Sequence, residues 1–173
     1  SALGASTSAW AVDLDDPAAT PDSFAVDTIV AADLDADGNT IIVTNVIETT
    51  ALGVGVASGN QIFVRVDLNN AAFTGAGVIA GDITVGAATA VAVAQGGAAD
   101  SAFVIFDITA PAGDLAQADP VDFTPASGIA LSGTSSASVT MTVYETLTAA
   151  INETESLYSV GGTFATTGTG VAT

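Results

Sequence analysis

The chemically most specific pattern in the chain is a run of three aspartates at alternating positions. Asp33, Asp35 and Asp37 lie in the segment Asp33-Leu-Asp-Ala-Asp-Gly-Asn-Thr40. Carboxylates at this spacing converge on one cation where a glycine permits a sharp turn, and calcium prefers oxygen ligands of this kind. The segment therefore predicts a calcium-binding loop.

This segment resembles the opening of the calcium loops of EF-hand, dockerin and related Asp-rich modules. The resemblance implies three side-chain ligands and one backbone carbonyl ligand, which would come from Asp33, Asp35, Asp37 and Asn39. The match ends after eight residues, because Ile41 stands at the ninth loop position and Thr44 replaces the bidentate glutamate at the twelfth. More distant carboxylates would have to complete the site, and the candidates are Asp13, Asp15, Asp16 and Asp67.

The alternative interpretation of the same segment is a β-hairpin. Asp37-Gly38 is a favoured two-residue turn, and strand-like runs flank it at 24–32 and 40–48. A second acidic cluster, Asp13-Leu-Asp-Asp16, has the same ambiguity. Asp13 and Asp15 would repel each other on one strand face unless a cation lay between them, but the cluster also fits a solvated loop.

The residue types present exclude most catalytic chemistry. The chain has no His and no Cys, so it lacks imidazole bases, thiolate nucleophiles and the usual ligands of zinc, haem and iron–sulfur clusters. An acid-only glycosidase remains compatible with the acids present, but aromatic residues, which normally line sugar clefts, make up only 6% of the chain. We expect a protein that is not an enzyme, with the glycosidase as the catalytic alternative.

The charge balance excludes several classes of partner. One basic side chain, Arg65, stands against 19 acidic ones, which gives a formal net charge of −18. Such a surface cannot neutralise phosphates, so we expect no nucleic-acid partner and no attachment to anionic membranes. No apolar run is long enough to insert into a membrane as a helix. Most of the acids are Asp, which favours turns and loops.

The periodicity of the chain is that of strands. In segment 61–68 the alternation places Ile62, Val64, Val66 and Leu68 on one face and Phe63, Arg65 and Asp67 on the other. Segment 138–145 alternates in the same way, with Val139, Met141 and Val143 inside and Thr140, Thr142 and Tyr144 outside. Further strands are expected at 10–14, 24–32, 40–48, 52–57, 73–79, 83–94, 102–109, 121–123, 129–131 and 157–165.

Glycine and proline mark turns between these strands, at 37–38, 58–60, 96–97, 111–113, 125–128 and 161–162. Helix is expected only as a turn or two within 146–156. Together these signals predict an all-β fold, an antiparallel β-sandwich or jelly roll of about ten short strands. The length suits a single domain over residues 1–173.

The two ends of the chain differ from its middle. Residues 1–9 and 166–173 are small, uncharged and compatible with β-structure. Such segments either fray, as chain ends commonly do, or leave their own domain and add a strand to a neighbouring subunit.

One modification motif occurs. Asn152-Glu-Thr154 is an N-glycosylation sequon, which has meaning only in an exported protein. It predicts a glycan on Asn152.

In composition the chain resembles the secreted subunits of prokaryotic surface assemblies, namely S-layers, extracellular filaments and fibres linked by donor strands. The features that carry this resemblance are the absence of Lys, abundant Ala, Thr, Val and Gly, the all-β pattern and the strand-like ends. The resemblance implies an extracellular or cell-surface protein that forms a homopolymer by strand addition, with calcium at Asp33–Asn39 as a stabiliser.

The alternative function is a calcium-dependent adhesin or carbohydrate-binding module. It would be a monomer that binds a glycan through an exposed face, for which the candidate aromatic residues are Trp10, Tyr144 and Phe63.

Overall fold

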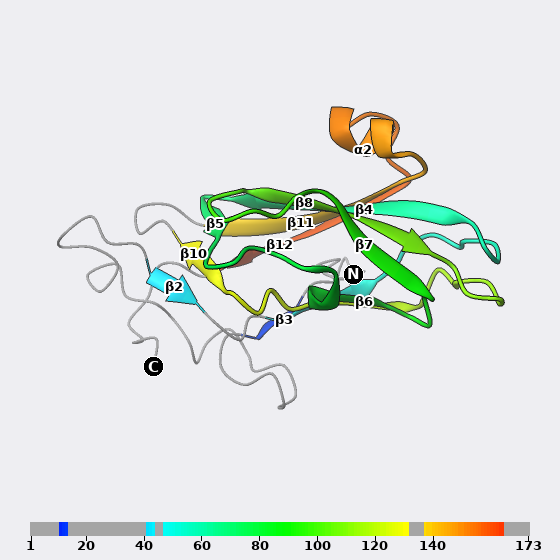
Figure 1. Cartoon of the computed structure of the whole chain (residues 1–173), viewed down its shortest axis with the longest axis horizontal. Coiled ribbons are helices and arrows are strands. Elements are labelled where there is room, and N and C mark those ends of the chain that lie inside the picture. The colour runs from blue at the N-terminus through cyan, green and yellow to red at the C-terminus, as the bar shows by residue number, and fades with distance from the viewer. Residues whose placement is uncertain (1–10, 14–40, 44–46, 132–136, 165–173) are drawn as a thin grey trace, which may run out of the picture.

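The computed structural model describes residues 11–13, 41–43, 47–131 and 137–164, and they form the predicted all-β fold of antiparallel sheets (Figure 1). A five-stranded sheet has the order β12 (Tyr158–Phe164), β11 (Ala137–Tyr144), β4 (Gln61–Asn69), β8 (Phe103–Thr109), β7 (Ala90–Gly96). A four-stranded sheet has the order β1 (Ala11–Asp13), β3 (Ile47–Ala51), β9 (Pro120–Phe123), β6 (Ile83–Val85). A three-stranded sheet has the order β2 (Ile41–Val43), β10 (Ile129–Leu131), β5 (Ala71–Phe73).

The five-stranded sheet packs its inner face on the other two sheets, as a sandwich does. On β4, the buried inward residues are the four that the alternation predicted, Ile62, Val64, Val66 and Leu68. On β11, the inward residues are Val139, Met141 and Val143, again as predicted. The core cluster joins these side chains to residues of β6 and β9 on the opposite layer, such as Val85 and Val121. The period-two pattern therefore identified the inner face of the central strands correctly.

Three phenylalanines connect the three sheets at the centre of this core. Phe123 of β9 lies between Phe73 of β5 and Phe106 of β8, with ring centroids 6.1 and 5.9 Å away and both pairs in edge-to-face geometry. All three side chains are at most 1% exposed. Edge-to-face pairs add to the free energy of burial, so this triad fixes how the sheets sit on one another.

A short helix, α2 (Leu147–Asn152), interrupts the connection from β11 to β12, where the sequence predicts a helical turn. Its first turn is capped by Thr146, whose hydroxyl accepts a hydrogen bond from the Ala149 amide at 3.1 Å. It ends at Glu153, which adopts a left-handed conformation. The helix lies over the outer face of the five-stranded sheet, away from the core between the layers (Figure 1).

The prediction of one strand over 83–94 is wrong. The chain forms β6 in one sheet, turns at Gly86–Thr89 and enters the other sheet as β7. Gly86 makes this turn at φ +46°, where a Cβ atom would lie 2.9 Å from the Asp119 side chain. Apolar residues continue through the turn because both strands contribute to the same core, so hydropathy alone does not show the change of sheet.

Four other segments differ from the predictions, and the strand predicted over 24–32 lies outside the described residues. The strand predicted over 40–48 is divided between β2 and β3, which belong to different sheets. Segment 52–57 contains only an isolated bridge between Val56 and Leu115. Segment 73–79 leaves β5 after Phe73, because Gly75 and Gly77 turn at positive φ. The predicted turn at 161–162 lies inside β12, where the two glycines pair with Thr140 and Val139.

Several aspartates have the turn role that composition predicts. The buried Asp82 carboxylate accepts hydrogen bonds from the Ile79 and Ala126 amides, at 2.9 and 3.3 Å. Asp119 accepts from the Ala116 amide at 2.9 Å in the same manner. These acids stabilise loops by satisfying backbone donors.

Truncating the central ring of the phenylalanine triad should therefore weaken the contact between all three sheets. We expect Phe123→Ala to lower the free energy of unfolding by about 3–5 kcal/mol, from lost burial and the cavity that remains. Denaturant unfolding measures this change. Thr84→Ala, at an exposed position on β6, is the control and should cost less than about 1 kcal/mol. Equal losses in the two variants would contradict a central role for Phe123.

Candidate functional site

The predicted calcium ligands Asp33, Asp35, Asp37 and Asn39 lie outside the described residues, as do Asp15 and Asp16. Asp13 belongs to β1, and Asp67 lies on the outer face of β4. Within the described ranges, no three carboxylates gather closely enough to hold a metal ion. The calcium loop therefore stays a prediction from sequence, and Asp67 is engaged in another interaction.

That interaction centres on Arg65, the chain's one basic residue, which lies under α2 on the outer face of β4. Its Nε donates to both carboxylate oxygens of Asp67 at 2.9 Å, two residues along the same strand face. Its Nη1 donates to the backbone carbonyls of Ala150 and Ile151, at 2.9 and 3.5 Å. Arg65 is only 8% exposed, so these contacts occupy a largely dry site.

Two further groups complete the contacts of Arg65. Its Nη2 lies 3.5 Å from Oε1 of Glu153, the residue that ends α2. Its guanidinium carbon lies 4.5 Å from the centre of the Phe103 ring. A helix leaves its last carbonyls without internal partners, and a cation at this end satisfies them and opposes the helix dipole. We call Arg65, Asp67, Phe103 and Glu153 the Arg65 anchor, because together they hold α2 on the sheet.

Burial at the anchor changes the titration of Asp67. Loss of water around the carboxyl group raises its pKa above the ordinary 3.8, and this effect exceeds the lowering by the hydrogen bond and charge of Arg65. The Glu153 carboxylate adds a smaller increase in the pKa of Asp67. Within the anchor, loss of water around Asp67 and attraction to Arg65 therefore shift the pKa of Asp67 in opposite directions.

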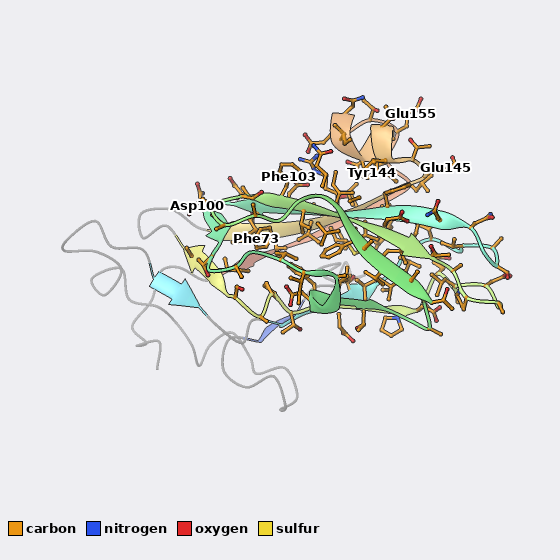
Figure 2. All side chains as sticks on the ribbon, viewed as in Figure 1. Phe73, Asp100, Phe103, Tyr144, Glu145 and Glu155 are labelled. Carbon is orange, nitrogen blue, oxygen red and sulfur yellow. The ribbon has the colours of Figure 1, made fainter. Side chains whose placement is uncertain are left out.

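The aromatic residues proposed as a ligand-binding face do not form one within the described residues. Tyr144 is only 4% exposed, because α2 covers it and packs it against Ile105 and Ala150. Phe63 is half-buried beside the same cluster. Figure 2 shows Tyr144 and Phe103 beneath the helix, between it and the sheet. Trp10, the third candidate, lies outside the described residues.

A different surface stands out on the side of the sandwich formed by β6 and β7. Strand β7 is the last strand of the five-stranded sheet and pairs with β8 alone among the described strands. Val91 and Val93 pack against the core, whereas Ala90, Ala92 and Ala94 are exposed. An outermost strand presents backbone amide and carbonyl groups that a further strand can pair with. We call residues Ala90–Gly96 the β7 edge.

The β7 edge carries no charge. From Ile83 to Ala99 the sequence contains no Asp, Glu, Lys or Arg, although the chain as a whole has a charge of −18. The neighbouring carboxylates belong to other segments: Asp107 lies one strand inward, opposite Ala92, and Asp119 lies beside Gly86 in the turn between β6 and β7. Natural edge strands are commonly protected from unwanted pairing by charged side chains or bulges. Here the strand itself has no charges. A bulge between Val93 and Gln95 interrupts it, and the 3-10 turn η1 (Ala80–Asp82) lies against part of it.

The first and last described strands lie on the opposite side of the sandwich. β12 is the far edge of the five-stranded sheet, β1 is the far edge of the four-stranded sheet, and the two lie against each other. The β6 and β7 edges are joined by the Gly86–Thr89 turn, so they share the other side. Segments 1–9 and 166–173 are continuous in sequence with the strands of the β1 and β12 side, not with those of the β7 side.

The sequon lies on a third face. Asn152 is the last residue of α2, and every residue from Ile151 to Leu157 is exposed. In Figure 2, Glu145 marks the base of this projection, where the chain leaves β11, and Glu155 lies near its top.

Sequence reasoning placed Arg65 on the outer face of its strand but missed its anchoring role. The available signal was a single basic residue in an apolar strand whose outer neighbours are Phe63 and Asp67. A charged side chain among such residues is expected either to face solvent or to be covered by a polar partner. The short helix that covers it is more than eighty residues away in sequence.

No protein-family model matches the chain, and no curated protein matches it. No helix among the described residues combines the length and the apolar character needed to span a membrane.

Removing the Arg65 side chain should detach α2. We expect Arg65→Met to lower the free energy of unfolding by about 3 kcal/mol, because it leaves the Asp67 carboxylate and two helix carbonyls without a donor. Denaturant unfolding measures the loss. Arg65→Lys keeps the charge without the planar fork and should recover only part of it. A methionine variant as stable as the wild type would contradict the anchoring role.

The raised pKa of Asp67 predicts a pH dependence with a definite sign. The native state binds the Asp67 proton more tightly than the unfolded chain does, so this group stabilises the fold when protonated. That contribution is present below the ordinary value of 3.8 and is lost as pH rises through the folded-state pKa. The Asp67→Asn variant has no ionisable group at this position and serves as the reference. Unfolding experiments across acidic pH should show wild-type stability rising relative to the variant as pH falls. A relative decline of the wild type would show that the Asp67 pKa is lowered.

Proposed function

We propose that this protein is the structural subunit of an extracellular filament or surface layer, and that copies join by strand addition at the β7 edge. The observation that carries the proposal is an exposed, uncharged outermost strand on a protein with a charge of −18. Backbone pairing is its source of affinity, and the partner is a second copy of this chain.

The electrostatics of the subunit favour this edge over the remaining surface. Two copies with a charge of −18 repel each other, and the repulsion is screened only beyond about 10 Å at 0.1 M salt. Contact is least unfavourable where the local charge is lowest, and the stretch 83–99 contributes no charged side chain of its own. Its small exposed side chains, Ala90, Ala92 and Ala94, also let a second backbone approach closely.

The arrangement of edges supports a polymer rather than a closed dimer. A strand supplied from either end of the chain would start from the β1 and β12 side and pair with the β7 edge of the next copy. The donating and accepting surfaces then differ, which makes the contact heterologous. Heterologous contacts that do not close into a ring produce open filaments.

Calcium enters the proposal as a stabiliser bound by Asp33, Asp35, Asp37 and Asn39. A divalent cation would reduce the repulsion between subunits in addition to ordering the loop. The alternative, a calcium-dependent adhesin or carbohydrate-binding module, has less support, because α2 covers Tyr144 and Phe63 is half-buried.

Electron microscopy of purified native protein tests the proposal directly, and we expect ordered polymers. Ala92→Glu should abolish them or raise the critical concentration at least about tenfold, equivalent to about 1.4 kcal/mol per contact. Thr148→Glu adds the same charge at an exposed position on α2 and should assemble like the wild type. Both variants change the net charge by the same amount, so a difference in assembly between them reports the effect of a charge at the β7 edge.

Monomers alone, with and without calcium and at high salt, would overturn the proposed function. Polymers that are unaffected by Ala92→Glu would show that copies join at another surface. Chelation should weaken the polymers if calcium contributes, and polymers equally stable without divalent cations would remove calcium from the proposal.

A further inference from the structure

We propose that Asn152 is the acceptor of an N-linked glycan. The inference rests on the extracellular location in the proposed function, because a sequon is modified only in an exported protein. It does not rest on strand addition, which concerns a different face of the molecule. It combines the sequon with three structural observations: the exposure of the segment, an Asn152 side chain for which the described residues show no hydrogen bond, and the anchored turn that presents it.

The connection between β11 and β12 is much longer than joining two adjacent antiparallel strands requires. A tight hairpin needs only two to five residues, yet residues 145–157 rise away from the sheet as α2 and its following turn (Figure 1). Every side chain from Ile151 to Leu157 is exposed, and two of them are the apolar Ile151 and Leu157, 41% and 48% exposed. The tip of this excursion therefore contributes little to the core.

The Asn152 side chain has no structural role among the described residues. Hydrogen bonds at this turn use the backbone, as when the Thr154 amide donates to the Ala149 carbonyl at 3.1 Å. Glu153, the middle residue of the sequon, turns back toward Arg65. Asn152 and Thr154 flank it and are exposed, so the two residues that a glycosyl-transferring enzyme recognises are accessible.

The position of the turn allows Asn152 to be modified without preventing the chain from folding. A six-residue helix has little stability of its own, so the sequon can adopt an extended conformation while the chain is unfolded or locally open. When the fold closes, Arg65 holds the Ala150 and Ile151 carbonyls from beneath, on the side facing the sheet. A glycan on Asn152 then extends into solvent without displacing these contacts.

The reaction is the transfer of an oligosaccharide from a lipid-linked diphosphate donor, catalysed by an oligosaccharyltransferase. The amide nitrogen of Asn152 attacks the anomeric carbon of the first sugar and forms the new C–N bond. The bond between that carbon and the diphosphate oxygen breaks, and the lipid diphosphate leaves with the electron pair. The amide nitrogen loses one proton to a base of the transferase, and no oxidant or reductant is required.

The chain offers a clean assay, because trypsin has a single cleavage site, after Arg65. Denatured protein from its native host is cleaved after Arg65, and mass spectrometry compares the fragment that begins at Val66 and contains Asn152 between the wild type and its variants. We expect the wild-type fragment to carry a glycan mass. Asn152→Gln and Thr154→Ala should remove that mass, and Thr154→Ser should retain it.

Asn69→Gln is the matched control, since Asn69 is exposed in the same fragment but begins no sequon. It should leave the mass shift unchanged. A native fragment whose mass differs from that of Asn152→Gln only by the substitution would overturn the inference, because no glycan would then depend on Asn152. That result leaves the proposed assembly intact, because polymer formation is measured separately and depends on the β7 edge.

Discussion

The cover over the outer face of the five-stranded sheet depends on one enclosed positive charge. Arg65 is the chain's only basic side chain, and its guanidinium is directed inward to Asp67, to the last carbonyls of α2 and to the Phe103 ring. This contact fixes the helix over the outer face of the five-stranded sheet and covers Tyr144 and Ile105. Because the cation is buried in this role, the described surface presents acidic and neutral groups without a basic side chain to pair with them.

That distribution of charge controls which surfaces can meet. The acids of the described residues lie mainly in turns and around α2, for example Asp82 and Glu153, whereas the stretch from Ile83 to Ala99, which includes β6 and β7, contributes no charged side chain. A neutral edge on an acidic protein is where self-association meets the least electrostatic resistance. The burial of Arg65 also means that it is not available for a salt bridge to a second copy, so the assembly we propose would rely on backbone pairing.

Much of the fold follows from local pattern, and the parts that do not follow have identifiable causes. The faces of β4 and β11 could be predicted because side chains of Val64, Met141 and their neighbours alternate with period two. The change of sheet at Gly86–Thr89 could not be predicted from the pattern. Strands β6 and β7 belong to different sheets, but both are apolar because both pack on the same core. Nor could the role of Arg65 be predicted, because its partners at Ala150 and Ile151 are backbone carbonyls, and any residue carries those.

The functional surfaces are separated by the same architecture. The β7 edge, the side formed by β1 and β12, and the α2 projection lie on different parts of the sandwich (Figure 1). In a polymer joined at the β7 edge, the α2 projection stays off the line of strand pairing, because it stands on the outer face of the sheet rather than at its edge. A glycan on Asn152 would then coat the assembly without entering its joints. The anchor that holds α2 to the sheet would set the direction in which that coat extends. Arg65, which is buried beneath α2, would therefore determine how the glycans are arranged on the outer surface of the polymer.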